Sequence, residues 1–357
     1  MKILFLCHNL TGGGAERVCV DVANGLAKLG HQVGIMTDTA QPITYVPLPE
    51  VKLIATAKYS NPISRRLGDF KHLLSVLKKE HPDVVISILY MNATLVKLAS
   101  ILSIHCPVIA SDHNSFEKPA SAPMPLWQKL DKFWRNYYMD GLTVLTEADR
   151  KVLNGRFKHT FVMPNPLCLK PLKEVPQKEK TVLAVGRLNA WHVKGFDLLL
   201  RAWARIGMDA SGWKLRIVGH GDDEAKRYLK SLAAGMENVE LLPYTSHIEE
   251  EYKKAAIFAL SSRYEGFGLV LTEAMSQGCA CVACDYKGRQ SEIITDGEDG
   301  LLCKVDDEAA LADKLQLLME DDKLRKRLQE NAIKNVDKFS IENTAKRWEE
   351  MLTSFYI

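Results

Sequence analysis

The sequence lacks a hydrophobic run long enough to span a membrane, and it lacks the marks of an export signal. Its longest apolar stretch, residues 84–110, is interrupted by Asn92, Lys97 and His105, whereas a spanning helix needs about 20 consecutive apolar residues. The opening MKILFLCHNL is not followed by a small-residue cleavage site, so it is typical of a buried strand. We therefore expect a soluble cytoplasmic protein.

An excess of charge of one sign is also absent. The 357 residues contain 47 Lys and Arg against 44 Asp and Glu, and 46% of them are hydrophobic, which excludes disordered and fibrous classes. Residues 1–165 carry 19 basic against 13 acidic side chains, and the remainder 28 against 31. This modestly basic first half favours an anionic partner, but it is far from the charge of a nucleic-acid-binding protein.

The eight cysteines occur without a signal peptide, which indicates free thiols in a reducing compartment. Cys279, Cys281 and Cys284 lie in the apolar run GCACVACD. Alternate side chains of a strand point to opposite faces, and no second cluster of Cys or His accompanies them. We therefore expect these thiols to pack as small apolar side chains rather than bind a metal.

Strand-like apolar runs alternate with helical patterns, which predicts parallel sheets covered by helices on both faces. A polar, proline-containing stretch around residues 164–180 separates two such series. The first half is expected to have strands at 3–7, 32–37, 84–87, 108–111 and 142–145, and a further strand-like run lies at 161–163. The second half is expected to have strands at 181–185, 214–218, 239–242, 257–260 and 280–284.

This organisation predicts an α/β protein with two doubly wound, Rossmann-like domains that face a central cleft, residues 1–165 and 166–339. Residues 340–357 form an amphipathic helical pattern. The sequence leaves open whether this terminal helix packs on its own domain or crosses back to the first.

A glycine loop follows the first strand. Gly12, Gly13 and Gly14 let the backbone approach a ligand, and the helix that they open attracts anions at its N-terminus. The loop is compatible with a tight turn, with an NAD site or with a loop that binds another polar ligand. Arg17 stands where the dinucleotide fingerprint needs glycine, although Asp38 stands at a spacing suited to a ribose-binding acid, so the last alternative is favoured.

Two cations follow the first strand of the second half. Arg187 comes directly after Gly186, and Lys194 lies seven residues further on, before Gly195 and a predicted helix. At the carboxyl edge of a sheet, a forked guanidinium and an ammonium group suit a diphosphate. Gly219, at the next strand–helix junction, allows a close backbone approach.

The segment from Glu265 to Glu273 carries the most specific signal. Its glycines open a helix, so the amides near residues 267–270 and the helix dipole are suited to phosphate oxygens. One carboxylate precedes this helix and the other lies inside it, so they reach different parts of one ligand. Carboxylates accept hydrogen bonds from sugar hydroxyls, which favours a ribose at one and a hexose at the other.

These residues resemble the retaining glycosyltransferases of family 4, which have the GT-B fold and an E-x7-E motif. The resemblance spans nearly the whole chain in order. Within the family the chain looks similar to enzymes that extend lipid-linked bacterial oligosaccharides, such as N-acetylgalactosaminyltransferases. The matching segments are GGGAERV at 12–18, Ser-Asp-His-Asn at 111–114, Asn-Pro at 165–166, Gly-Arg-Leu at 186–188, Lys-Gly at 194–195, Gly-His-Gly-Asp at 219–222, Glu265 to Glu273, Glu-Ile-Ile at 292–294 and Asp-Gly-Leu-Leu at 299–302.

The resemblance implies a role for each matching residue. Arg187 and Lys194 would contact the donor diphosphate, Glu273 the ribose and Glu265 the transferred sugar, with His113 reaching that sugar from the first domain. His113, Arg187, Lys194 and Glu265 are the expected catalytic set. The expected donor contacts are Gly13, Gly14, Arg187, Lys194, Gly219, Glu265, Gly266, Phe267, Gly268, Leu269 and Glu273.

Two positions depart from the family pattern. Ala280 replaces a proline, and Gly288-Arg289-Gln290 replaces a Gly-Pro or Gly-Gly loop. The second departure places an arginine within expected reach of donor or acceptor.

The acceptor is expected in the first domain. Two predicted helices combine basic and aromatic residues, which suits an anionic bilayer or a lipid diphosphate. The alternative is that their apolar faces pack on the sheet and their charges are ordinary surface charges. The candidate acceptor or membrane residues are Arg65, Arg66, Lys71, Trp127, Lys132, Trp134 and Arg135.

The predicted function is therefore a glycosyltransferase that moves a hexose or N-acetylhexosamine, with UDP as the favoured carrier, to a glycan acceptor. The resemblance implies that it needs no cofactor and no protein-bound metal, which is consistent with the lack of an Asp-x-Asp motif. We also expect it to bind no nucleic acid. We expect peripheral attachment to the inner face of the cell membrane. The alternatives are a nucleotide-sugar epimerase of the same fold, a dehydrogenase, and a non-catalytic sugar-nucleotide-binding subunit.

Overall fold

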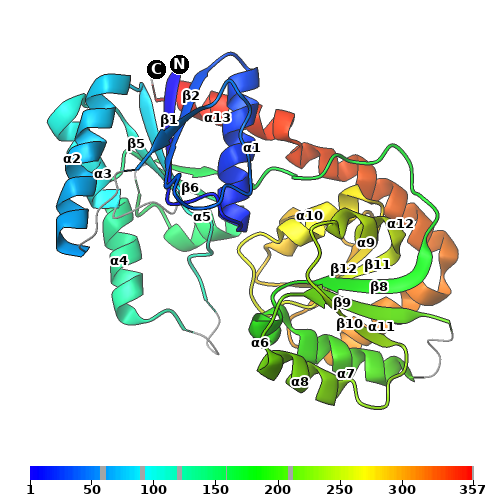
Figure 1. Cartoon of the computed structure of the whole chain (residues 1–357). Coiled ribbons are helices and arrows are strands. Elements are labelled where there is room, and N and C mark those ends of the chain that lie inside the picture. Colours follow the sequence, from blue (N-terminus) through cyan, green and yellow to red (C-terminus); the bar gives the residue numbers. More distant parts are fainter. Residues whose placement is uncertain (57–61, 89–92, 119–122, 158, 208–211, 356–357) are drawn as a thin grey trace. The chain divides into compact units, whose positions relative to one another are not determined.

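The computed structural model describes the chain except residues 57–61, 89–92, 119–122, 158, 208–211 and 356–357 (Figure 1). The chain divides into two compact units. Unit 1 comprises Met1–Cys168 together with Phe339–Ile357, and unit 2 comprises Leu169–Lys338. The division at 168/169 lies close to the expected boundary at 165/166, and the terminal segment belongs to unit 1.

Unit 1 is built on a parallel sheet with the strand order β3-β2-β1-β4-β5-β6-β7. Along β1 the side chains alternate between the two faces. Leu4 and Leu6 join the core beneath two helices, whereas Phe5 points to the opposite face. The described strands are β1 (Lys2–Cys7), β2 (Gln32–Thr37), β3 (Lys52–Ala55), β4 (Val84–Ile88), β5 (Val108–Ser111), β6 (Gly141–Val144) and β7 (Thr160–Val162).

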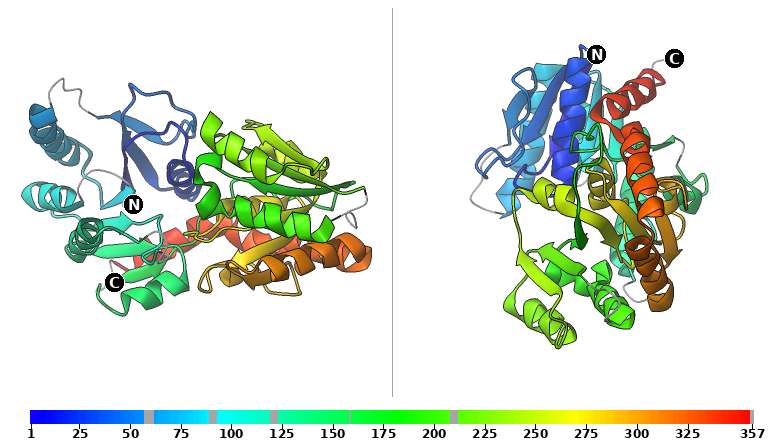
Figure 2. Two further views of the ribbon diagram at one scale, coloured as in Figure 1. Left: turned by 90° about the horizontal axis from the view of Figure 1, so that it is seen from below. Right: turned by 90° about the vertical axis from the view of Figure 1, so that its right-hand side faces the viewer.

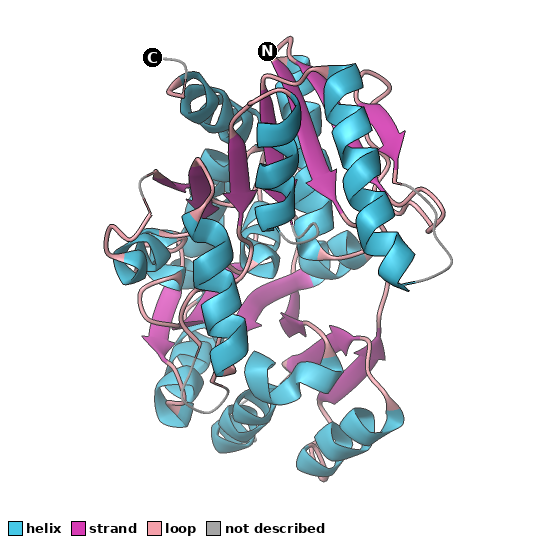
Figure 3. Ribbon diagram, turned by 90° about the vertical axis from the view of Figure 1, so that its left-hand side faces the viewer, coloured by secondary structure: helices cyan, strands magenta, loops and turns pink. Residues whose placement is uncertain are grey.

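Helices cover both faces of the unit 1 sheet, and Figure 3 shows them flanking the strands. Helices α2 and α3 pack over β1 and β4 on one face, where Leu73 and Val96 are fully buried. Helix α1 lies on the other face. The described helices are α1 (Gly14–Lys28), α2 (Pro62–Glu80), α3 (Ala93–Ser103), α4 (Leu126–Tyr137), α5 (Glu147–Leu153) and α13 (Ile341–Thr353).

The terminal helix α13 packs on unit 1 and answers the question that the sequence left open. It lies beside α1 in Figure 1 and in both views of Figure 2. Trp348 is buried against Phe5, with ring centroids 6.4 Å apart. A Cβ on Gly25 would lie 2.7 Å from the Cβ of Ala345, so this glycine allows the two helices to approach closely.

Unit 2 is built on a second parallel sheet, with the order β10-β9-β8-β11-β12-β13. The central strands β8 and β11 are hydrogen-bonded neighbours, and the chain proceeds outwards from them in opposite directions. The described strands are β8 (Glu179–Val185), β9 (Lys214–Gly219), β10 (Val239–Pro243), β11 (Ala255–Leu260), β12 (Ala280–Asp285) and β13 (Leu301–Lys304).

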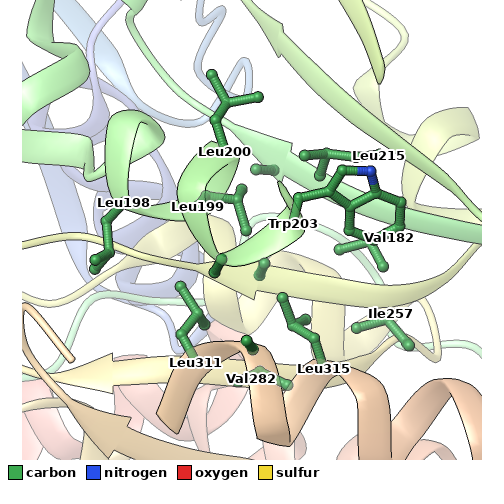
Figure 4. Packing of buried hydrophobic residues seen from close by; sticks show 14 of the residues in the cluster. Val182, Leu198, Leu199, Leu200, Trp203, Leu215, Ile257, Val282, Leu311 and Leu315 are labelled. Carbon is green, nitrogen blue, oxygen red and sulfur yellow. The ribbon is translucent and has the colours of Figure 1, made fainter. Parts of the chain in front are cut away.

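The core of unit 2 lies between its sheet and the helices on one face. Figure 4 shows Trp203 of α7 beside Val182 and Leu215, in the same core cluster as Leu199 and Leu315. Helices α9, α10 and α12 pack against β11 or β12 as well. The described helices are α6 (Trp191–Lys194), α7 (Phe196–Ile206), α8 (Asp223–Leu232), α9 (Ile248–Lys254), α10 (Leu269–Ser276), α11 (Glu308–Glu320) and α12 (Asp322–Asn335), with 3-10 turns at Leu188–Ala190 and Gln290–Glu292.

The fold class is confirmed, and two strands extend it. β3 and β13 lie at sheet edges and were not expected as strands. The side chains of β3 are mostly exposed, so this strand lacks the buried apolar pattern that identified the others. Cys279, Cys281 and Cys284 are fully buried, which confirms their expected packing. Across the described residues, none of the helices has the length and apolar content needed to cross a bilayer.

Candidate functional site

The candidate site in unit 2 lies where the strand order reverses. The chain leaves β8 for β9 on one side, and β11 continues to β12 on the other. In open parallel sheets, ligands bind beyond the carboxyl ends of the strands at such a switch point. Here the loop after β8, residues 186–195, meets the loop after β11, residues 261–268.

Lys194 and Glu265 form the ion pair that joins these loops. The Nζ atom of Lys194 lies 2.6 Å from Oε1 of Glu265, and their side chains are 19% and 12% exposed. The hydroxyl of Ser262 donates to the same carboxylate oxygen at 2.8 Å. The sequence predicted both charged residues for one donor site, and the structure brings them into contact across 71 positions of the chain.

The two loops also touch through their backbones. Gly195 has a φ of +64°, and a Cβ on it would lie only 1.9 Å from the carbonyl oxygen of Ser261. The hydroxyl of Ser261 donates to the carbonyl oxygen of Lys194 at 2.9 Å. Glycine is therefore required at position 195 both for the left-handed backbone and for the close approach.

Arg187 lies at the carboxyl end of β8, and its side chain is exposed. The amide of Leu188 donates to the carbonyl oxygen of His220 at 2.8 Å, which ties this loop to the loop after β9. A Cβ on Gly219 would lie 1.8 Å from the carbonyl oxygen of Gly186. Gly219 therefore serves the approach of two protein loops, whether or not a ligand also lies there.

Helix α10 begins after the glycines of the third loop. Gly268 is its N-cap, with a φ of +106°, and Leu269 is its first residue. Gly266 is partly buried beside Phe267, whose side chain is buried, and the Phe267 carbonyl accepts a hydrogen bond from Nε2 of Gln290 at 3.3 Å. The amides at the start of this helix and the positive end of the helix dipole suit an anion.

Glu273 lies inside α10 and is only 8% exposed. The buried hydroxyl of Tyr252 donates to its Oε2 atom at 3.1 Å. Burial, together with the adjacent Glu273 charge, raises the pKa of Tyr252 well above its ordinary value, so the phenol remains a donor at neutral pH. This bond orients the carboxylate of Glu273.

In the Gly288-Arg289-Gln290 loop, the side chain of Arg289 does not lie where it was expected from the sequence. The side chain of Arg289 is fully buried and lies over the ring of Tyr286, 5.1 Å from its centroid. Its guanidinium donates to the Tyr286 carbonyl at 3.4 Å. The residue that the sequence placed within reach of donor or acceptor is thus packed inside unit 2.

In unit 1, His113 follows β5 and is held through both ring nitrogens. Nδ1 lies 3.1 Å from Oδ1 of Asn165, and Nε2 lies 3.1 Å from the hydroxyl of Ser111. Thr143 donates to that hydroxyl at 2.8 Å. Since the Asn165 oxygen only accepts, Nδ1 carries the proton and Nε2 accepts from Ser111. Burial lowers the pKa of His113 below its ordinary value, against the opposing effects of Asp112 and Asn165.

The glycine loop of unit 1 follows β1, with Gly13 as the N-cap of α1 and Gly14 as its first residue. The guanidinium of Arg17 donates to the Cys168 carbonyl at 3.0 Å, so this residue fastens α1 to the end of the unit. Asp38 accepts from the amide of Ala40 at 3.0 Å, which is a local turn contact.

The predicted acceptor residues separate into three groups. Lys71 and Trp134 are exposed. The prediction for Lys132 is wrong, because its side chain is only 9% exposed and turned inward. Asp112 lies 3.1 Å from its ammonium group, and the ring centroid of Phe116 lies 3.9 Å from it. The side chains of Arg65, Arg66, Trp127 and Arg135 lie outside the described part of the structure.

Several residues of the site were missed. Ser262 and Tyr252 orient the two predicted glutamates, and Arg263 joins the loop that holds Lys194 through its backbone and side chain. Their position next to Glu265 is visible in the sequence for Ser262 and Arg263, whereas nothing local marks Tyr252. No group of three or more potential metal ligands occurs among the residues that the structure describes.

Comparison with known families matches both units. The family model described as Glycosyltransferase Family 4 matches residues 12–170, and the model described as Glycosyl transferases group 1 matches residues 170–335. The two matches follow each other along the chain and meet at the division between the units.

Individual relatives cover nearly the whole length. A Campylobacter jejuni GalNAc-alpha-(1->4)-GalNAc-alpha-(1->3)-diNAcBac-PP-undecaprenol alpha-1,4-N-acetyl-D-galactosaminyltransferase is 29% identical, over 99% of this chain and 98% of its own length. An amylovoran biosynthesis glycosyltransferase of Erwinia amylovora is 28% identical, over 98% and 99% respectively. The structure of Anabaena HepE in complex with UDP has a TM-score of 0.79 at 18% identity, over 99% of this chain and 100% of that one.

Proposed function

The chain belongs to glycosyltransferase family 4, has the GT-B fold and is a glycosyltransferase enzyme, and on this premise we propose its substrates. We propose that it moves a hexose or N-acetylhexosamine from UDP to a lipid-linked glycan acceptor and retains the anomeric configuration. The relative from Campylobacter jejuni is named for an undecaprenol-linked acceptor, and HepE has been seen with UDP. Both names support this choice of substrates.

The observation that carries the proposal is the Lys194–Glu265 pair at the switch point of unit 2. A diphosphate needs cationic and amide donors, and a hexose needs acceptors for its hydroxyls. The exposed Arg187, the ammonium group of Lys194 and the first turn of α10 supply the donors. Glu265 and Glu273 supply the acceptors.

We propose a front-face transfer. The bond between the anomeric carbon and the diphosphate oxygen breaks, the acceptor hydroxyl oxygen bonds to the same face of that carbon, and its proton passes to the departing diphosphate. Negative charge therefore develops on the diphosphate. Arg187, Lys194 and the amides near Gly268 stabilise this charge electrostatically without moving a proton themselves.

The donor site is tested by thermal unfolding with UDP, GDP, ADP and NAD. A ligand that binds the folded but not the unfolded chain stabilises the folded state by about 2.7 kcal/mol when its concentration is roughly one hundred times its dissociation constant. We expect a shift with UDP that disappears in Lys194→Ala. A shift with GDP alone would change the proposed carrier, and a shift with NAD alone would overturn the proposal.

Turnover is tested with a radiolabelled UDP-sugar and an undecaprenyl diphosphate-linked glycan. Transfer of label to the lipid-soluble acceptor, with the anomeric configuration kept, is the expected result. Release of an altered UDP-sugar without acceptor would indicate an epimerase. Binding of the donor without transfer or hydrolysis would indicate a non-catalytic subunit.

A lipid-linked acceptor requires access to a membrane, and we propose that unit 1 provides it. Leu126, Leu130, Trp134 and Tyr137 form an exposed stripe on α4, with 61–71% of each residue accessible. Besides the buried Lys132, helices α2, α3 and α4 together contain eight Lys or Arg against three Asp or Glu. Exposed Leu, Trp and Tyr beside positive charge suit the surface of an anionic bilayer.

This attachment is tested by sedimentation with phosphatidylglycerol vesicles at physiological salt. We expect the full chain to sediment and the double variant Leu130→Ser/Trp134→Ser to lose about ten-fold in partitioning, because it loses much of the inserted apolar area. Leu317→Ser, at an exposed leucine of α11 in unit 2, is the control. Unchanged partitioning of the double variant would refute the surface, and a change in its oligomeric state alone would indicate that a second copy covers it.

A further inference from the structure

We propose that the buried pair of Arg263 and Asp197 is a positioning device that sets the place of Lys194 in the donor site. The inference rests on the proposed function, because it gives the pair a role that acts through Lys194. Neither residue touches the proposed ligand groups directly. Arg263 belongs to the loop after β11, and Asp197 belongs to the first turn of α7.

Arg263 lies in the loop after β11, two residues before Glu265, and is 8% exposed. Its NH1 and NH2 atoms donate to the two carboxylate oxygens of Asp197 at 2.6 Å and 2.9 Å. This is a bidentate contact, which fixes the orientation of both groups more strictly than a single ion pair. The Nε atom of Arg263 also donates to Asp306.

The same residue holds the backbone that leads to Lys194. NH1 of Arg263 donates to the carbonyl of His192 at 2.7 Å, and its own amide donates to the carbonyl of Val193 at 2.9 Å. Asp197 lies in the first turn of α7, just after Lys194 and Gly195. Arg263 therefore forms hydrogen bonds to residues on both sides of Lys194: His192 and Val193 before it and Asp197 after it.

The charges of the pair are balanced inside unit 2. Asp197 is 4% exposed, and Arg201, which is 44% exposed at its side chain, also contacts it at 3.1 Å. Burial opposes the ionised carboxylate, but the hydrogen bonds and charge of Arg263 outweigh it and lower the pKa of Asp197. The pair therefore stays ionised at neutral pH.

Such a pair contributes more to the positioning of neighbouring groups than to the stability of the fold. Buried ion pairs contribute little net stability, because desolvation offsets most of their attraction. A site, however, must hold its groups to within about 0.5 Å, and a misplacement of about 1 Å can lower a rate by about 10². A fixed fork behind Lys194 meets that requirement, whereas a flexible lysine in its place does not.

The test compares Arg263→Lys with Arg201→Lys. Both variants keep the positive charge and both residues contact Asp197, but only the first loses the buried fork. We expect Arg263→Lys to lower kcat about ten-fold to one-hundred-fold, with a smaller change in KM for the donor, and Arg201→Lys to change kcat less than about two-fold. If circular dichroism shows that Arg263→Lys is unfolded, Asp197→Asn takes its place with the same expectation.

A second measurement separates positioning from a general structural role. If Arg263 acts through Lys194, adding Arg263→Lys to Lys194→Ala lowers kcat by less than about two-fold further, whereas independent effects multiply. Wild-type kcat in Arg263→Lys, or full multiplication in the double variant, would overturn the inference. If Lys194→Ala itself retains normal kcat, the proposed donor site has failed; a large loss in Lys194→Ala beside normal kcat in Arg263→Lys refutes the positioning role alone.

Discussion

Each unit places a lysine beside an acidic residue near the carboxyl ends of its strands, and the two lysines differ in how their ammonium groups are used. In unit 1, Lys132 contacts Asp112 at 3.1 Å and donates to the carbonyls of Asn114 and Ser115 at 2.9 Å and 3.2 Å. In unit 2, Nζ of Lys194 has Glu265 as its hydrogen-bond partner among the described residues. A lysine whose donors are all bonded internally holds the fold, whereas one with donors left over is suited to an anion.

The units therefore share a fold but not a chemistry. The polar network around His113 consists of Ser111, Thr143 and Asn165, which are uncharged. The loops of unit 2 are joined by ionised groups, with Lys194 at the surface of the network and Arg263 inside it. Such a difference between the strand-end loops of the two units shows why function has to be argued from the site rather than from the fold.

The largest expected effect is the loss of transferase activity on replacing Lys194. Lys194→Ala removes a cation from the proposed diphosphate site and should lower kcat at saturating donor by roughly 10²–10³, the effect of losing one charge-stabilising donor. Lys214→Ala is the control, since Lys214 is an exposed lysine that also pairs with a glutamate in unit 2. Near-normal turnover of Lys194→Ala would remove this residue from the site.

The reverse comparison concerns stability. Lys132→Ala leaves Asp112 without its buried partner and should lower the free energy of unfolding by about 3–5 kcal/mol, the range for breaking a buried pair. Lys194→Ala should lower it by less, because Glu265 keeps its bond to Ser262, whereas Lys132→Ala also removes the donor to the carbonyls of Asn114 and Ser115. Urea unfolding of both variants measures the difference, and equal losses would contradict the proposed division of roles.

The error over Lys132 illustrates what a sequence withholds. The composition of α4, with its lysines and aromatic residues, predicted a surface helix, and the exposure of Trp134 agrees with that. Which side of the helix faces inward depends on the loop before it. In that loop, Asp112 and the Asn114 carbonyl bind the ammonium group of Lys132. Helical periodicity does not reveal a buried lysine, since its charge marks it as a surface residue.

The residues of the proposed donor site could be predicted from the sequence more easily than the residues that orient them. Glycines, cations and glutamates at strand ends identified Lys194 and Glu265, because such residues have few structural roles in those places. Their contact depends on β8 and β11 being neighbours, which is a property of strand order and is not visible locally. Tyr252 was missed for the same reason, since it reaches Glu273 from another helix.

A smaller effect is expected at His113. The family resemblance implies a contact from His113 to the transferred sugar, and on that proposal His113→Ala should lower kcat/KM about ten-fold, the upper range for a neutral bond. Since burial lowers the pKa of His113, the wild-type ring stays neutral at pH 7. As pH falls below the ordinary value of about 6.5, the unfolded chain binds the proton first, so stability is lost on the acid side.

Replacing His113 by alanine should remove that part of the acid-side loss. Urea unfolding of both chains between pH 7.5 and about 5 measures it, and Asn165→Ala, which frees Nδ1, is the companion variant. An unchanged acid limb in His113→Ala would mean that another group causes the loss.

The smallest expected effect is that of metal removal. It tests whether the negative charge of the diphosphate is neutralised by groups of the protein or by a divalent ion. Unit 2 offers Arg187, Lys194 and the first turn of α10, and we propose that these cations and amides do the work that a bound divalent ion does in other transferases. We expect EDTA to change the initial rate less than about two-fold. The same assay with Lys194→Ala sharpens the result, because added Mg²⁺ should then restore part of the lost rate by neutralising the same charge. A wild-type rate abolished by EDTA and recovered with Mg²⁺ would show that Lys194 and Arg187 are insufficient, and the charge balance proposed for unit 2 would have to include a metal.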